Sequence, residues 1–152
     1  PSEKLAVVVD TGPLFAAASR RDQAHDLAAR LIELGGRELL IPDPVLAECD
    51  ALLRRRDGHA VARELLSTIA AGTYVRMQLS PSLFADAVAI DAHYRDLGLG
   101  LVDAAVMAIA ASTKSAILTF DFRDFRAAPP LHGGAWDFVI EESEYVRATR
   151  TR

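Results

Sequence analysis

Short apolar runs alternate along the chain with segments of helical periodicity, and this alternation limits the fold more than any other feature. Unbroken runs rich in Val, Ile and Leu suit strands that are covered on both faces. Strands separated by helices favour a parallel sheet. We therefore predict an α/β fold with a central, mainly parallel sheet and helices on both faces. The predicted strands are residues 5–9, 38–42, 116–120 and 137–140, with residues 73–79 as a further extended segment.

Caps and helix breakers divide much of the remaining chain into predicted helices. Asp43 is predicted to cap one of them, with Pro44 in its first turn, where the missing N–H costs nothing. Residues 11–13, Thr-Gly-Pro, follow the first strand and are typical of a turn. The predicted helices are residues 22–34, 44–57, 59–71, 81–97 and 101–115.

Composition sets further limits on what the chain can be. With 152 residues, 51% of them hydrophobic, it is long enough for one compact domain. The longest apolar run, residues 104–111, is far below the roughly 20 residues that span a bilayer, so we expect a soluble cytoplasmic protein that does not contact a membrane. The single Cys49 has no disulfide partner in the chain, and it is predicted to be a buried apolar side chain.

Four acidic residues stand at positions where the predicted fold would bring them together. Asp10 and Asp121 each follow a predicted strand, and parallel strands deliver the residues after them to the same edge of the sheet. Glu48 borders the apolar face of the helix after the second strand. Asp103 lies in the first turn of a helix that is apolar all round. We expect all four carboxylates to converge at one sheet edge.

Each acid also has an ordinary structural explanation. Asp10, Asp103 and Asp121 are good capping residues, and Glu48 suits a solvated helix face. A cluster of carboxylates, however, repels itself unless it shares protons or binds a hard divalent cation. The four histidines are scattered and show no spacing typical of metal ligands. Oxygen-only ligands favour magnesium or manganese over zinc, and the sequence therefore predicts such a metal site.

Four segments in this order resemble the PIN-domain family, and most closely its VapC toxins: "VVVDTGPLFA", "VLAECDALL", "GLVDAAVMAIA" and "ILTFDFRDF". The resemblance extends from about residue 7 to 140. It implies a PIN-like three-layer sandwich and a magnesium-dependent ribonuclease that cleaves single-stranded or looped RNA, with manganese as the alternative ion. It also implies inhibition by a small VapB-like antitoxin and a homodimer. We expect one PIN-like domain over residues 1–152, with its core at about 5–140 and a C-terminal tail at 141–152.

Hydrolysis of a phosphodiester needs an activated water, neutralised phosphate charge and a stabilised leaving oxygen, all of which divalent ions supply. We assign Asp10 and Asp103 as direct ligands of the metal. Glu48 is assigned as a ligand or as a residue that positions water, and Asp121 as a ligand that binds directly or through water. With the metal bound, the local field changes sign, so the net charge of −4 does not exclude RNA.

Several neighbouring residues have two interpretations. Asp124 offers a second acid in the last motif, and it is assigned a supporting place outside the ligands. Thr11 and Thr119 lie beside site acids and either hold water and phosphate oxygens or serve only the turn and the strand. Residues 54–56, three arginines at a helix end, complement the helix dipole more readily than they bind phosphate. Residues 120–125 include three Phe side chains that suit the core better than base stacking.

A catalytically silent PIN-like module that binds RNA or protein is the main alternative function. The presence of all four acids argues against it, since the loss of a ligand is the simplest sign of an inactive site. Two predicted helices, 22–34 and 82–97, also carry more apolar residues than one sheet face needs. They serve the core, a homodimer interface or a groove that receives an amphipathic antitoxin segment.

Overall fold

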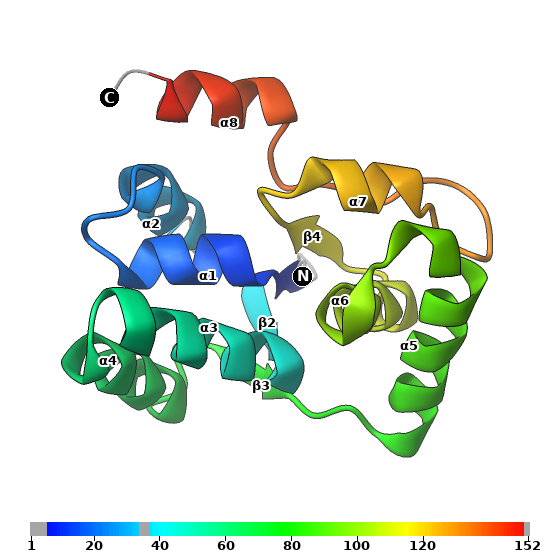
Figure 1. The fold of residues 1–152 in the computed structure, drawn as a ribbon, viewed down its shortest axis with the longest axis horizontal. Coiled ribbons are helices and arrows are strands. Elements are labelled where there is room, and N and C mark those ends of the chain that lie inside the picture. Colours follow the sequence, from blue (N-terminus) through cyan, green and yellow to red (C-terminus); the bar gives the residue numbers. More distant parts are fainter. Residues whose placement is uncertain (1–5, 34–36, 151–152) are drawn as a thin grey trace, which may run out of the picture.

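The computed structural model describes residues 6–33 and 37–150, and the central element is a parallel sheet. Its strands follow the order β3-β2-β1-β4, and every neighbouring pair is parallel (Figure 1). Val7 of β1 pairs with Leu39 on one side and with Ala116 on the other. The predicted α/β fold with a parallel sheet is thus confirmed. The strands are β1 (Ala6–Val9), β2 (Glu38–Pro42), β3 (Val75–Met77) and β4 (Ala116–Leu118).

Helices cover both sides of this sheet. In the view of Figure 1, α1, α2 and α4 lie on one side of the strands, and α5 and α6 lie on the other. Helix α6 packs against β1, β2 and β4. The helices are α1 (Thr11–Ala18), α2 (His25–Glu33), α3 (Asp43–Arg56), α4 (His59–Ala70), α5 (Pro81–His93), α6 (Gly100–Thr113), α7 (Phe122–Ala127) and α8 (Glu142–Thr149), with a short 3₁₀ turn at Arg95–Leu97.

The core lies between β1 and α6. The three valines of β1 and residues 104–110 of α6 are each at most 2% exposed. Alanine and other compact side chains on α6 let the helix approach the sheet closely, and each fully buried Val contributes about 1.5–3 kcal/mol. Cys49 is buried and unpaired, as predicted. Among the described residues, no helix is both long enough and apolar enough to cross a membrane.

The segment after β1 differs from the prediction of a turn. Helix α1 begins directly at Thr11, because the carboxylate of Asp10 accepts the backbone N–H of Thr11 and caps the helix at the tip of the strand. Gly12 and Pro13 therefore stand in the first turn of a helix, where a proline needs no hydrogen-bond acceptor for its nitrogen. Turn residues and first-turn residues are the same types, and the sequence alone does not separate them.

Helix and strand ends also differ at several places. Asp43 does not cap α3 but forms its first residue, and Pro42 is the N-cap. The long helix predicted up to residue 97 ends at His93, and the 3₁₀ turn continues to Gly98, whose left-handed φ of 63° stops it. The predicted strand at 137–140 is reduced to a single bridge between Phe138 and Ile117. Residues 5 and 34–36, part of the predicted strand and of a helix end, lie outside the described residues.

The two predicted helices with surplus apolar residues differ in how far those residues are buried. Leu27 and Leu31 of α2 are buried in the core, so α2 presents no leucine stripe to a partner. On α5, Phe84 is 49% exposed and Val88 is 51% exposed. The apolar surface that remains open therefore lies on α5.

The predicted tail at 141–152 contains helix α8. None of its residues is buried, but the Tyr145 ring stacks on Phe120 with 4.5 Å between ring centroids and 19° between planes. Glu142 forms an ion pair with Arg126 of α7. This helix is not among the predicted ones, because contacts of Tyr145 and Glu142 with distant residues place it.

Candidate active site

A cavity of about 360 Å³ opens at the carboxyl edge of β1 and β4. The strands are neighbours, and the backbone N–H of Asp10 donates to the carbonyl of Leu118 at 2.9 Å. The structure brings all four predicted acids to this cavity, although they come from different elements. Its walls include Asp10, Glu48, Asp103 and Asp121.

Asp10 is the most constrained of these acids. It is 6% exposed, and its carboxylate accepts hydrogen bonds from the Thr11 backbone N–H and from the Thr119 hydroxyl, both at 2.8 Å. Burial raises the pKa of Asp10, the two hydrogen bonds oppose that rise, and nearby Asp121 and Glu48 add to it. Asp10 therefore caps α1 and also faces the cavity. Its capping role and its place in the acidic cluster do not exclude each other.

The hydroxyl of Thr119 links two of the acids. It donates to Asp10 and accepts the backbone N–H of Asp121 at 3.0 Å. Thr119 is buried, and its hydroxyl proton is already engaged. Of the two interpretations, this geometry favours a residue that orients the acids rather than one that binds a phosphate oxygen.

The hydroxyl of Thr11 differs from that of Thr119 in its hydrogen bonding. Its hydroxyl oxygen is buried, lies in the wall of the cavity and has no hydrogen-bond partner among the described residues. A buried polar group without a partner costs about 1–3 kcal/mol. A ligand or water oxygen in the cavity would remove that cost.

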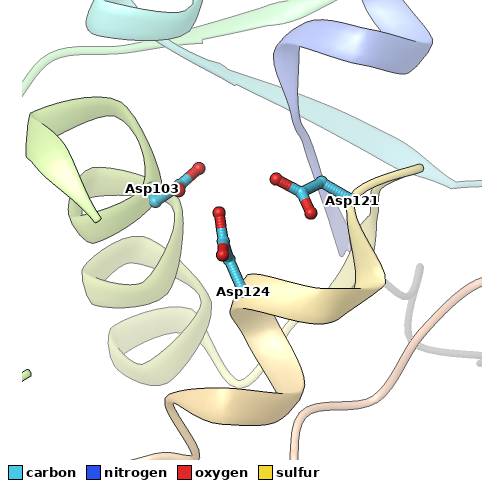
Figure 2. Close-up of side chains that lie close together, drawn as sticks. All are labelled: Asp103, Asp121 and Asp124. Carbon is cyan, nitrogen blue, oxygen red and sulfur yellow. The ribbon is translucent and has the colours of Figure 1, made fainter. Parts of the chain in front are cut away.

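Three carboxylates meet most closely at the junction of α6 and α7. Figure 2 shows the side chains of Asp103, Asp121 and Asp124 directed toward one another. One oxygen from each lies within 4.8 Å of the others. Asp121 is the N-cap of α7 and Asp124 lies in its first turn, so their spacing of three residues places them on one side of the helix start.

Asp124 lies nearer to the site than the sequence interpretation placed it. Its carboxylate belongs to the closest group, together with Asp103 and Asp121. The signal that could have placed it is the spacing of Asp121 and Asp124 at a helix start. That signal is usable only once α7 is recognised as a helix.

The acids raise one another's pKa values. The pKa of Asp103 rises to about 7, first because of burial and then because of the charges of Asp10, Asp124, Asp121 and Glu48. Burial and the neighbouring Asp124 raise the pKa of Asp121. Ionising the group without a cation is unfavourable, so a bound cation would stabilise it.

The donor set fits a hard divalent cation. Oxygen ligands bind Mg²⁺ at about 2.0–2.1 Å and Ca²⁺ at about 2.3–2.6 Å, so opposite ligands lie roughly 4–5 Å apart. The three-carboxylate group has this size. The described residues that line the cavity include neither His nor Cys, the ligands typical of zinc.

Two other walls of the cavity carry aromatic side chains. On one, the guanidinium of Arg56 lies over the Phe15 ring, with Cζ 5.4 Å from the ring centroid. On another, Phe120 stacks with Tyr145, and both line the cavity. Phe122 and Phe125 are buried, as expected for core residues, whereas Phe120 is only partly buried.

Known proteins share this fold and up to about a quarter of the aligned residues. Ribonuclease VapC26 of Mycobacterium tuberculosis is 27% identical over 134 residues, which are 88% of this chain and 99% of that protein. The crystal structure of VapC20 from the same organism, described as a toxin that cleaves the sarcin–ricin loop, matches with a TM-score of 0.74 at 24% identity, covering 84% of this chain and 98% of that one. A toxin–antitoxin complex from Klebsiella pneumoniae matches with a TM-score of 0.61 at 22% identity, covering 82% and 93% of the two chains.

The family model named PIN domain matches residues 7–129. This span contains the four motifs on which the sequence resemblance rests and far exceeds half of the chain. The resemblance is thereby confirmed, and the chain belongs to the PIN domain family.

Proposed function

We propose that this protein is a metal-dependent endoribonuclease and the toxin of a type II toxin–antitoxin pair. The observation that carries the proposal is the group of three carboxylate oxygens, from Asp103, Asp121 and Asp124, that lie within 4.8 Å of one another. Two of these acids, Asp103 and Asp121, line the cavity together with Asp10 and Glu48. The names of its relatives support the reaction class, since one is a ribonuclease and another an RNA-loop-cleaving toxin.

We assign Mg²⁺ as the ion, with Mn²⁺ as the alternative, because the available donors are oxygens. Asp10 and Asp103 would bind it directly, and Asp121 directly or through water. Glu48 would act as a ligand or as a residue that positions water. Asp124, whose carboxylate lies close to those of Asp103 and Asp121, would support them. When bound, such an ion neutralises phosphate charge and lowers the pKa of the attacking water. It also reverses the sign of the local field, so that this acidic cavity attracts RNA phosphates.

Side chains and backbone groups of the protein orient the acids and the reacting water. The Thr119 hydroxyl and the Thr11 backbone N–H fix the Asp10 carboxylate from two directions. Glu48 lines the cavity from α3 and is exposed, so it would be able to orient a water there. The free hydroxyl of Thr11 would donate to a phosphate or water oxygen.

An RNA cleavage assay with and without Mg²⁺ tests this proposal. Wild-type protein should cut single-stranded RNA with Mg²⁺ and stop when EDTA is added. Asp10→Asn and Asp103→Asn should be inactive, while Asp96→Asn, at an exposed acid away from the cavity, should cut normally. RNA binding without cleavage by any metal-loaded preparation would instead favour the silent PIN-like module.

The proposed partner is a small VapB-like antitoxin. The toxin–antitoxin complex among the similar structures supports it. Co-expression with the product of the adjacent open reading frame should yield a stable complex with suppressed ribonuclease activity, and it should relieve growth arrest caused by the chain alone. A chain that is harmless to its host when expressed alone, and binds no small neighbouring product, would contradict the toxin role.

A homodimer is the proposed assembly. Its support is the exposure of apolar side chains on two helices that pack together: Phe84 and Val88 of α5, and Leu101 of α6, which is 48% exposed. Light scattering should give twice the chain mass, and Val88→Glu should return the monomer. A wild-type protein that is monomeric at assay concentration would contradict it.

A further inference from the structure

We infer that Arg56 binds a phosphate of the RNA backbone that flanks the phosphate held at the acids. This inference rests on the proposed function, because it takes RNA as the substrate. Arg56 is the last residue of α3, and among the described residues that line the acidic cavity it is the only Arg or Lys. A cavity with one guanidinium and several carboxylates has separate places for a cation and for an anion.

On helix α3, Arg56 lies on the same face as Glu48. Glu48, Leu52 and Arg56 are spaced four residues apart, and all three line the cavity. Residues at this spacing share one face of a helix. Eight residues at 1.5 Å each separate Glu48 from Arg56 by about 12 Å along the axis. Arg56 thus serves a phosphate other than the one nearest the carboxylates.

The guanidinium is held in place but has open hydrogen-bond donors. The Phe15 ring lies beneath it, and the backbone carbonyl of Arg56 accepts a hydrogen bond from Arg21. Within the described part of the chain, its side chain makes no hydrogen bond or ion pair, including with the cavity acids. By contrast, Arg54 donates to Asp50 at 2.9 Å. A planar fork of N–H groups held on a ring suits bidentate binding of phosphate.

The simpler explanation is that Arg56 complements the helix dipole and packs on Phe15. Arg55 provides the matched test of that explanation. It lies in the same last turn and is exposed, so it has the same relation to the dipole, but it does not line the cavity. Any effect specific to Arg56 therefore reports on the cavity.

The test is the binding of a short single-stranded RNA by the full chain in an Asp103→Asn background, at fixed Mg²⁺ and increasing NaCl. Arg56→Ala should weaken binding roughly tenfold, as expected for one charge-assisted contact. The slope of log K against log salt should fall in magnitude by about 0.7, the change for one phosphate contact on a single strand. Arg55→Ala should leave both unchanged. Arg56→Lys should keep the slope and lose part of the affinity, because charge remains without the fork.

Equal losses in Arg55→Ala and Arg56→Ala, or an unchanged salt slope in Arg56→Ala, would overturn the inference. Thermal unfolding of each variant controls for folding, and Arg56→Lys keeps most of the packing on Phe15 if the alanine variant is unstable. Cleavage by the wild type separates this inference from the proposed function. Arg56-dependent binding without cleavage overturns only the nuclease, whereas cleavage with no Arg56-specific effect overturns only the inference.

Discussion

Two cavities near α1 shift the pKa values of their carboxylates in opposite directions. The larger, about 600 Å³, is lined by residues of α1, α2 and α4 and includes Arg21 and Asp57, which form an ion pair at 3.2 Å. There, hydrogen bonds from Ser19 and Arg21 lower the pKa of Asp57. In the acidic cavity, burial and like charges raise the pKa values of Asp10, Asp103 and Asp121.

This difference separates an acid with a partner in the chain from one without. Asp57 is satisfied by its own protein, so its negative charge stabilises the fold. The acids of the smaller cavity destabilise the fold when ionised, and protonation or a bound cation would relieve this cost. Raised pKa values in a group of acids that also lie close together fit a candidate cation site, whereas a lowered pKa fits an internal ion pair.

The largest expected difference in RNA cleavage is between two variants in which one acid of each cavity is replaced by Asn. Asp103→Asn should reduce RNA cleavage on the order of 100-fold or more, because even groups that only support a metal ligand are worth about 10–100-fold. Asp57→Asn should leave cleavage close to wild type. Metal-free Asp103→Asn should unfold at an equal or higher temperature, since like-charge repulsion is relieved. A marked loss of thermal stability would indicate that Asp103 has a structural role.

The next effect concerns Thr119, whose hydroxyl orients Asp10. Thr119→Val keeps the shape of the side chain but leaves the buried Asp10 carboxylate with one fewer donor. We expect a 10–100-fold loss of cleavage, as for other groups that orient metal ligands, and a loss of about 1–3 kcal/mol in unfolding free energy. Thr119→Ser, which keeps the hydroxyl, is the control. Equal losses in both variants would show that the methyl group, not the hydrogen bond, matters.

The pH dependence of stability should differ in direction between the cavities. The pKa of Asp103 is raised from 3.8 to about 7, so metal-free protein should be stabilised below pH 4 by this group and lose that contribution as pH rises through 7. Asp57, with a lowered pKa, stabilises the fold above its unfolded pKa and stops doing so in acid. Urea unfolding at several pH values measures both, and Asp103→Asn should remove the change near pH 7. A wild-type curve that is flat between pH 6 and 8 would contradict this assignment.

The smallest effect is expected at the ion pair of the larger cavity. Arg21 is mostly exposed, so Arg21→Ala should cost about 0–1 kcal/mol of unfolding free energy. Arg21 also donates to the Arg56 carbonyl, but cleavage should stay within about twofold of wild type, because the acids are untouched. A tenfold loss of cleavage in Arg21→Ala would show that the two cavities are coupled through the end of α3.

Much of the acidic cavity could be predicted from the sequence, whereas the larger cavity could not. The apolar runs predicted the parallel sheet, and the ends of its strands predicted where Asp10 and Asp121 would emerge. Glu48 and Asp103 followed from acids placed beside apolar helix faces. These signals work because they are local, or because sheet geometry relates them directly.

The parts that were missed depend on contacts between distant residues. The spacing of Arg56 from Glu48 and Leu52 puts it on their helix face, but only the distant Phe15 ring and the cavity wall show what that face meets. Asp124 joined the site because α7, a helix of six residues, turned it toward Asp103. Tyr145 lines the cavity because its ring packs against Phe120 and Phe122, which are distant from it in the sequence.

Helix α8 also has a practical consequence for experiments. It lies beyond the span that the family model matches, and none of its residues is buried. The Tyr145 ring, which contacts Phe120 and Phe122, and the ion pair of Glu142 attach it. A helix attached so lightly detaches at a much lower free energy than the core. Its amide protons should exchange with solvent far faster than those of β1. An affinity tag or fusion partner joined after α8 would disturb one wall of the cavity, so activity measured with such a protein would understate that of the free chain.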